Sequence, residues 1–302
     1  MDARVGFYTG VLIRFTGRKY FLTRKLACDG TKVLKGSFNS LIERGHIMFY
    51  KLSQTIGLKD VDKNCKVKNV AILEMLENAA GGHSDAVGYG MLDIDNTGIT
   101  FVLLDWYVRV LDRPGYSEDL TVSTWGRPEK RMMSLIRDYE LRDSNDKLRA
   151  LATSRWVIID MNRHRITRVT PEILDAFGAE EKQVFETDPM IKIDRPKAAA
   201  SGIPEAEPEL MGTSIIGRSA LDLVGHVHNI KYIDMAEDMM PADIWAQAPF
   251  DNFRIHYRKE ITEGEKISFK YSFIDNLKHE IRMVNEAGEL NAAVRMWNTP
   301  LT

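Results

Sequence analysis

The sequence predicts an α+β fold made of two similar units, each with one helix and an antiparallel sheet. Three observations support this prediction. A helical pattern precedes four closely spaced strand patterns, and the same order returns in the C-terminal half. The last strand pattern of each half also has a similar sequence, KLRALATSRW at 147–156 and ELNAAVRMW at 289–297. Self-similarity of this kind is typical of an internal duplication.

The composition is that of a folded protein with a sizeable core. The chain has 302 residues, enough for two domains of ordinary size, and 44% of them are hydrophobic. Its net charge of −2 argues against general nucleic-acid binding. Its two cysteines, Cys28 and Cys65, have no CxxC neighbour, so we expect no disulfide framework, no zinc site and a reducing, cytoplasmic location. The sequence has no run of 18 apolar residues, so we expect no membrane-spanning helix.

Residues 1–47 differ from the rest of the chain in charge. They contain nine Lys or Arg and three Asp or Glu. Their apolar run near residues 11–13 is too short for a secretory signal core. Three interpretations remain open: a poorly ordered basic extension, a targeting segment, or a translation start assigned too early, with Met48 the true start. We favour the first or the third.

The predicted first unit covers residues 48–177. It contains a short strand at 65–67, followed by a helix at 67–88. Apolar residues at steps of three or four place one face of this helix in the core: Val70, Leu73, Leu76 and Ala80. Gly81 and Gly82 are expected to end or kink the helix.

Four strands follow this helix. Each is rich in β-branched and aromatic residues, and turn sequences separate them. They are predicted at 97–110, 119–125, 132–142 and 148–159. Because the strands are too close together for helical crossovers, an antiparallel meander is favoured over a parallel sheet.

The predicted second unit, residues 213–302, follows a linker at 178–212. The linker lacks periodicity and contains Pro189, Pro196, Pro204 and Pro208. In the second unit, a strand at 213–219 and a helix at 227–240 precede four more strands. These are predicted at 252–260, 266–275, 278–285 and 290–297. Two such units most simply pair edge to edge into one continuous sheet, because this arrangement hides two exposed edges.

The stretch DLVGHVHNIKY at 222–232 carries the first candidate functional residues. Asp222 precedes His226 by four residues, Gly225 lies at the bend between them, and the predicted helix follows. An acid, a bend, a histidine and a helix start within so few residues suggest a catalytic loop. The alternative is structural, with a histidine that satisfies a turn and an aspartate that caps the helix or stabilises the bend.

From about residue 65 to residue 297, the chain resembles the acyl-acyl carrier protein thioesterase family. The family carries D-x-N-x-H-x-N-N-x-x-Y in its second unit, which is matched here by Asp222, His226, Asn229 and Tyr232. The family also has a glutamate in a Y-R-R-E-C-like segment, and the sequence YRKE places Glu260 there. The resemblance implies a double hotdog fold, in which each curved sheet wraps around its own helix. It also implies a thiolester hydrolase without a cofactor or metal.

Three positions depart from the family pattern. Val224 stands where the family has Asn, His228 where it has the first Asn of the pair, and Ile261 where plant members have Cys. Ile261 therefore excludes a cysteine nucleophile at this point. Val224 removes an amide that would orient a water or the histidine. This leaves three interpretations: slower chemistry, a relay through His228, or a non-catalytic descendant.

The resemblance suggests roles for the matching residues. Thioester hydrolysis needs a nucleophile or water, a proton acceptor and donors for the oxyanion. Glu260 is the expected base or direct nucleophile, His226 would position the water, and Asp222 would hold the loop or set the histidine tautomer. The oxyanion donors are expected among the backbone N–H groups at the start of the predicted helix. The supporting residues there are Val227, His228 and Asn229.

The implied activity is hydrolysis of fatty acyl-acyl carrier protein in fatty-acid biosynthesis, with free fatty acid as the product. The implied partner is the carrier protein with its acyl-phosphopantetheine arm, and a monomer or homodimer is expected. Two alternatives stay open: a coenzyme A thioesterase on the same fold, and an acyl-binding protein without activity. A hotdog dehydratase is disfavoured, because no G-H-F-P-like segment precedes a helix.

Three further groups have a structural and a functional interpretation. Glu74 and Glu77 in the first helix are interpreted as a partly exposed face in preference to a catalytic helix acid. Four methionines fit an acyl tunnel or the core equally well: Met75, Met235, Met239 and Met240. A basic cluster is interpreted as a solvated turn, with docking of the acidic carrier protein as the alternative. It comprises Arg163, His164, Arg165 and Arg168.

Overall fold

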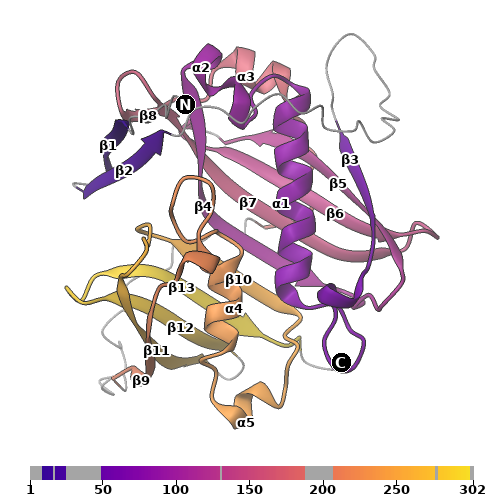
Figure 1. The fold of residues 1–302 in the computed structure, drawn as a ribbon. Coiled ribbons are helices and arrows are strands. Elements are labelled where there is room, and N and C mark those ends of the chain that lie inside the picture. The colour runs from indigo at the N-terminus through magenta and orange to yellow at the C-terminus, as the bar shows by residue number, and fades with distance from the viewer. Residues whose placement is uncertain are drawn as a thin grey trace, which may run out of the picture.

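The computed structural model describes residues 9–15, 18–24, 49–129, 131–187, 207–275 and 278–299. It contains two units with the same order of elements (Figure 1). The first unit consists of β3 (Tyr50–Thr55), α1 (Asn69–Ala86), β4 (Ile99–Val110), β5 (Asp119–Pro128), β6 (Leu135–Asp143) and β7 (Leu148–Asp160). The second unit consists of β9 (Glu209–Ile215), α4 (Lys231–Glu237), β10 (Asn252–Tyr257), β11 (Lys266–Asp275), β12 (Lys278–Asn285) and β13 (Leu290–Trp297). The predicted duplication of a strand, a helix and four strands is therefore confirmed.

All ten strands of the two units form one antiparallel sheet. The order is β3-β5-β6-β7-β4 in the first unit and β9-β11-β12-β13-β10 in the second, and the two halves join where β4 pairs with β10. Because the same strand order occurs twice, the two halves are related by an approximate twofold axis at the β4–β10 seam. The predicted edge-to-edge pairing of the units is confirmed.

A buried charged cluster crosses this seam. Asp105 of β4 is 2% exposed. Its Oδ1 accepts hydrogen bonds from Arg254 Nη2 at 3.0 Å and from His256 Nδ1 at 2.7 Å, both on β10. A buried carboxylate is tolerated when cationic or polar donors surround it, as they do here. The seam is therefore held by side chains as well as by the backbone ladder.

Helix α1 lies across the concave face of the first half-sheet (Figure 1). Its packed face comprises Ala71, Ile72, Leu73, Met75, Leu76, Ala79 and Ala80, each 5% exposed or less. The helix continues through Gly81 and Gly82, contrary to the prediction that these glycines end or kink it. Packing explains the second glycine, because a Cβ on Gly82 would lie 2.4 Å from the hydroxyl oxygen of Tyr50.

Several predicted boundaries are wrong, and each error arises where tertiary contacts replace a local pattern. The predicted strand at 65–67 is only a pair of isolated bridges. Strand β3, which was not predicted, pairs with β5 at the edge of the sheet. The strand predicted at 213–219 lies at Glu209–Ile215 and so begins within the predicted linker. The helix predicted at 227–240 begins only at Lys231, because the preceding backbone pairs with neighbouring loops.

Smaller elements complete the fold. They are β8 (Arg165–Thr167), which pairs with β7, and the short helices α2 (Ile94–Thr97), α3 (Pro171–Ala176) and α5 (Ala242–Trp245). The predicted basic extension contains a hairpin of β1 (Thr9–Phe15) and β2 (Arg18–Arg24). Residues 188–206 of the predicted linker lie outside the described residues. Within the described ranges, no helix is long and apolar enough to cross a membrane.

Candidate active site

The Asp222 side chain builds the candidate catalytic loop. Its Oδ1 accepts hydrogen bonds from the backbone N–H of Val224 at 2.9 Å and of His226 at 3.1 Å. The Asp222 N–H in turn donates to the His226 carbonyl at 2.7 Å. Gly225 occupies the bend with φ +85°, a left-handed conformation that glycine adopts at low cost. The predicted loop-holding role of Asp222 therefore has a direct geometric basis.

The segment after β10 brings Glu260 beside this loop. The Val227 N–H donates to the Ile261 carbonyl at 2.8 Å, and His226 forms a β-bridge with Thr262. Asn291 of β13 donates its Nδ2 to the Glu260 carbonyl at 3.2 Å. Glu260 itself lies three residues beyond the end of β10, in a loop, and is not at the end of a strand as predicted.

The buried side chain of Tyr232 lies near the carboxylates of Asp222 and Glu260. It is 3% exposed at the start of α4. Burial is the main cause that raises the pKa of its phenol, and the charges of Glu260 and Asp222 raise it further. The backbone contacts therefore place the loop of Asp222 and His226 beside the segment that carries Glu260, although 34 positions separate His226 from Glu260 in the chain.

Two of the three predicted backbone oxyanion donors, the N–H groups of Val227 and His228, are already engaged. The Val227 N–H donates to Ile261, and the His228 N–H donates to the Ala220 carbonyl at 2.8 Å. The Asn229 carbonyl accepts a hydrogen bond from the Tyr257 hydroxyl at 2.8 Å. Because the helix begins later than predicted, the N–H groups of Val227 and His228 hold the loop in place and do not face a substrate oxygen. This part of the prediction is wrong.

An acid of the first unit reaches the loop of the second. Glu77 Oε2 of α1 lies 2.6 Å from His228 Nε2. This hydrogen bond is the main cause that raises the pKa of His228. The prediction of an exposed helix face holds for Glu74, which pairs with Lys59 at 2.8 Å. Glu77 is also partly exposed, at 21%, but its side chain bridges the two units.

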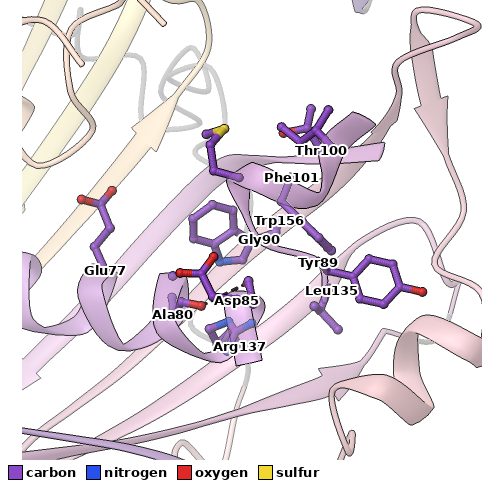
Figure 2. Close-up of a pocket in the computed structure, with 14 residues that line it drawn as sticks. Glu77, Ala80, Asp85, Tyr89, Gly90, Thr100, Phe101, Leu135, Arg137 and Trp156 are labelled. Carbon is purple, nitrogen blue, oxygen red and sulfur yellow. Dashed lines mark hydrogen bonds between the residues drawn. The ribbon is translucent and has the colours of Figure 1, made fainter. Parts of the chain in front are cut away.

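A cavity of about 250 Å³ lies alongside α1 in the first unit. Glu77 lines one end of it, apart from the other labelled residues (Figure 2). Its walls include Ala80, Phe101, Leu135 and Trp156. None of the four methionines proposed for a tunnel lines the cavity. Met75 and Met240 are buried in the core, and Met235 and Met239 pack against the core.

The cavity also has a polar wall. Arg137 is 3% exposed, and its Nη1 lies 2.8 Å from His83 Nδ1. Its guanidinium also packs over the ring of Phe177 at 5.1 Å from the ring centroid. Burial lowers the pKa of Arg137 and raises that of Asp85, which lines the same cavity. The cavity is therefore mostly apolar with a few polar groups, as is common for small-molecule sites.

The first unit contains a second copy of the same loop. Asp62 Oδ1 accepts from the N–H of Asn64 at 2.8 Å and of Lys66 at 2.9 Å, as Asp222 does for Val224 and His226. Cys65 takes the place of Gly225 and also has a positive φ of 57°. The sequence signal for this copy is DVDKNCKVKN at 60–69, which the prediction did not recognise because only Asp62, Val67 and Asn69 match the second loop.

The two copies differ in their chemistry. Val67 N–H donates to the Pro114 carbonyl, as Val227 does to Ile261, so Arg113 occupies the position of Glu260. Lys66 and Lys68 replace the two histidines of the second loop. Arg113 is itself engaged, donating to Asn69 Oδ1 at 3.0 Å and to backbone carbonyls. The first copy therefore keeps the turn but lacks the acid and base groups.

Two family models match this chain on either side of the linker. Residues 48–177 match the acyl-ACP thioesterase N-terminal domain, and residues 214–299 match the acyl-ACP thioesterase C-terminal domain. The chain belongs to the acyl-ACP thioesterase family. The double hotdog fold expected from the resemblance is thereby confirmed.

Members of the family resemble this chain over most of its length. Oleoyl-acyl carrier protein thioesterase 2 of Arabidopsis thaliana is 24% identical over 76% of this chain, which spans 63% of that protein. An acyl-ACP thioesterase structure from Bacteroides thetaiotaomicron has a TM-score of 0.70 at 20% identity, covering 82% of this chain and 97% of that one. The 12:0-ACP thioesterase of Umbellularia californica has a TM-score of 0.69 at 17% identity, covering 84% and 98%.

The positions that depart from the family motif have clear structural settings. Ile261 is fully buried, and its carbonyl anchors the Val227 N–H, so it serves packing. Val224 corresponds to Asn64 of the first loop, where the asparagine occupies the same turn. Cys65 is exposed in the first loop, away from Glu260. Within the described residues, no cluster of three metal-ligating side chains is present.

The basic cluster extends from the turn between β7 and β8 to the residue after β8. All of its members are exposed: Arg163, His164, Arg165 and Arg168. Arg163 pairs with Asp160 at 3.7 Å, and this exposed pair contributes little to stability. The cluster is a solvated turn in this structure, as expected.

Proposed function

We propose that this member of the acyl-ACP thioesterase family hydrolyses fatty acyl-acyl carrier protein, releasing free fatty acid. One observation carries the proposal: the loop of Asp222 and His226 lies against the Glu260 segment and, through His228, against Glu77 at one end of the cavity. An acyl chain in the cavity would have its thioester at that end. The substrate's acyl-phosphopantetheine arm would enter there from the carrier protein.

In the proposed reaction, Glu260 accepts a proton from water that His226 positions. The water oxygen adds to the thioester carbonyl carbon, and the carbonyl electron pair moves to oxygen. When the intermediate collapses, the C–S bond breaks and the thiolate takes the proton from Glu260. The products are a fatty acid and the carrier's thiol, so the atoms and charges of the reaction balance without a metal or a cofactor.

The proposed function can be tested by release of thiol from carrier protein loaded with one fatty acyl chain. His226→Ala and Glu260→Gln should each lower kcat by about 10²–10⁴-fold, because each removes a proton-transfer or water-positioning group. Thermal unfolding of each variant controls for folding. Near-wild-type turnover in both variants would remove these residues from the site.

Two comparisons separate the alternatives. The same acyl chain on coenzyme A should be hydrolysed more slowly, and a faster reaction would favour a coenzyme A thioesterase. The acyl-binding alternative predicts that the wild-type protein binds acyl thioesters without releasing thiol. A cytoplasmic location and the choice between monomer and homodimer stay predictions, and the plant relatives are named as chloroplastic proteins.

Val224→Asn tests whether the missing amide limits the rate. The side chain should fit, because Asn64 occupies the same turn in the first unit. One added hydrogen bond of ~1 kcal/mol, made in the transition state, should raise kcat by roughly five- to tenfold. An unchanged kcat would mean that another group, such as His228, already fills this role.

A further inference from the structure

The pair of Glu77 and His228 connects the two units at the candidate site. Glu77 belongs to α1 of the first unit, and His228 to the loop of the second. Their 2.6 Å contact between Oε2 and Nε2 is a charge-assisted hydrogen bond when the imidazole is protonated. Because Glu77 also lines the cavity, this pair lies at the end where the acyl chain would begin.

Both partners are oriented by this contact. Glu77 accepts at Oε2, so the Nε2 of His228 carries a proton and its Nδ1 is the remaining ring nitrogen. Among the described residues, Nδ1 has no hydrogen-bond partner. The His228 side chain is 38% exposed, so Nδ1 is accessible to a ligand.

Two of the three predicted backbone oxyanion donors are not available to a substrate. The N–H groups of Val227 and His228 are engaged by the carbonyls of Ile261 and Ala220. An oxyanion needs preorganised donors, and the loss of one such donor costs about 10²–10³-fold in rate. A cationic ring at the start of the acyl cavity can meet that need.

The first copy of the loop provides an internal comparison. There, Glu237 of α4 occupies the position that corresponds to Glu77, and its Oε1 accepts from Asn69 Nδ2 at 2.9 Å. Burial raises the pKa of Glu237 to about 7. No histidine is present in that loop, so the acid–imidazole pair occurs only in the copy that also has His226 and Glu260.

We infer that the His228 imidazolium donates its Nδ1–H to the oxyanion of the thioester intermediate, and that Glu77 is the positioning residue that keeps this ring oriented and charged. The inference rests on the proposed function and adds a catalytic group to the same site. The carboxylate of Glu260 remains the proton acceptor.

The charges that face His228 are consistent with a protonated ring. Glu77 on α1 and Asp222 on its own loop are acidic and raise its pKa, whereas Lys231 on α4 lowers it. The two acids have the larger combined effect, and the hydrogen bond to Glu77 is the main cause. Removing the Glu77 charge should therefore favour the neutral ring.

The decisive experiment compares Glu77→Gln with Glu237→Gln in thiol release from acyl-carrier protein across pH. Glu77→Gln should lower kcat by about 10-fold or more at pH 8 with little change in KM, and by much less below the ordinary histidine pKa of ~6.5, where the ring is charged without help. Glu237→Gln removes the symmetry-related carboxylate and should keep wild-type kcat. An equal loss in Glu77→Gln at every pH would indicate a purely structural role and overturn the inference.

Substitutions of His228 complete the test. His228→Ala should lower kcat by about 10²–10³-fold. His228→Asn keeps a neutral donor, so it should recover part of that loss and make the further addition of Glu77→Gln nearly without effect. Wild-type kcat in His228→Ala would overturn the inference while the proposed function stands. A wild-type protein that releases no thiol would contradict both this inference and the proposed function.

Discussion

Single residues decide which of the two matching loops can support chemistry. The aspartates Asp62 and Asp222 build the same turn through the same pair of backbone contacts. That turn needs only an accepting oxygen and a residue that tolerates positive φ, so the positions between them are free to diverge. Lys66 and Arg113 consequently stand where the second loop has His226 and Glu260, and the chemistry is confined to the second copy.

His228 gives the site a pH signature at this scale. Its pKa is raised in the folded protein, chiefly by the hydrogen bond to Glu77. The pair therefore stabilises the fold fully below the unfolded histidine pKa of ~6.5, and this stabilisation is lost as pH rises through the folded value. The difference in unfolding free energy between the wild type and His228→Asn should be larger at pH 5.5 than at pH 9. Urea unfolding at the two pH values measures it, and an equal difference would contradict the assigned pair.

At the scale of elements, helix α1 performs two tasks at once. One face fills the core of the first unit, and its partly exposed side carries Glu77 to the loop of the second. Helix α4 mirrors this arrangement with Glu237 reaching Asn69. Each helix therefore contacts the other unit's copy of the loop through one glutamate, so neither unit holds a complete site by itself.

The two adjacent glycines of α1 should respond differently to substitution. A Cβ on Gly81 meets no atom within 4 Å, so Gly81→Ala should raise the unfolding free energy by ~0.8–1 kcal/mol through helix propensity. A Cβ on Gly82 would collide with the Tyr50 ring, so Gly82→Ala should show no such gain and lower stability. Thermal unfolding of both variants measures the contrast. A gain in Gly82→Ala equal to that in Gly81→Ala would contradict this packing.

At the scale of the whole molecule, the β4–β10 seam makes one body of two repeats. The apolar core is continuous across it and includes residues of both helices, such as Leu76 of α1 and Ile233 of α4. Backbone pairing alone would leave the seam open to slippage, because a β ladder is weakly specified without side-chain contacts. The buried contacts of Asp105 with Arg254 and His256 set its register.

Asp105→Ala should weaken the entire fold. It removes the carboxylate that accepts from the buried Arg254 and the partly buried His256, and loss of one partner of a buried pair costs about 3–5 kcal/mol. Both units should still unfold together, at a lower midpoint, in a single transition. Glu74→Gln is the matched control, because its exposed pair with Lys59 should contribute less than ~1 kcal/mol. A midpoint for Asp105→Ala equal to that of the control would contradict the role of the seam.

The sequence by itself determined the duplication, the strand and helix order of each unit and the motif around Asp222 and His226. These features are local: period-3.6 and period-2 patterns and turn residues follow from the contacts that each short segment makes with one core. Even the partnership with Glu260 was accessible, through the resemblance of YRKE to a family segment. One error was the unpredicted edge strand β3, and others fell at element ends, such as Val227 and His228, whose N–H groups donate to neighbouring loops.

Only the tertiary structure decided what lies between the two units. The contact of Glu77 with His228 joins residues 151 positions apart, and no local pattern distinguishes Glu77 from the solvated Glu74 one turn away. Arg113 likewise occupies the position of Glu260 only because the segment after β4 folds beside the first loop, where the Val67 N–H donates to the Pro114 carbonyl. The sequence gives the chemistry of each side chain. Which charges pair across the seam depends on how the two half-sheets dock, and docking is a property of the packed fold.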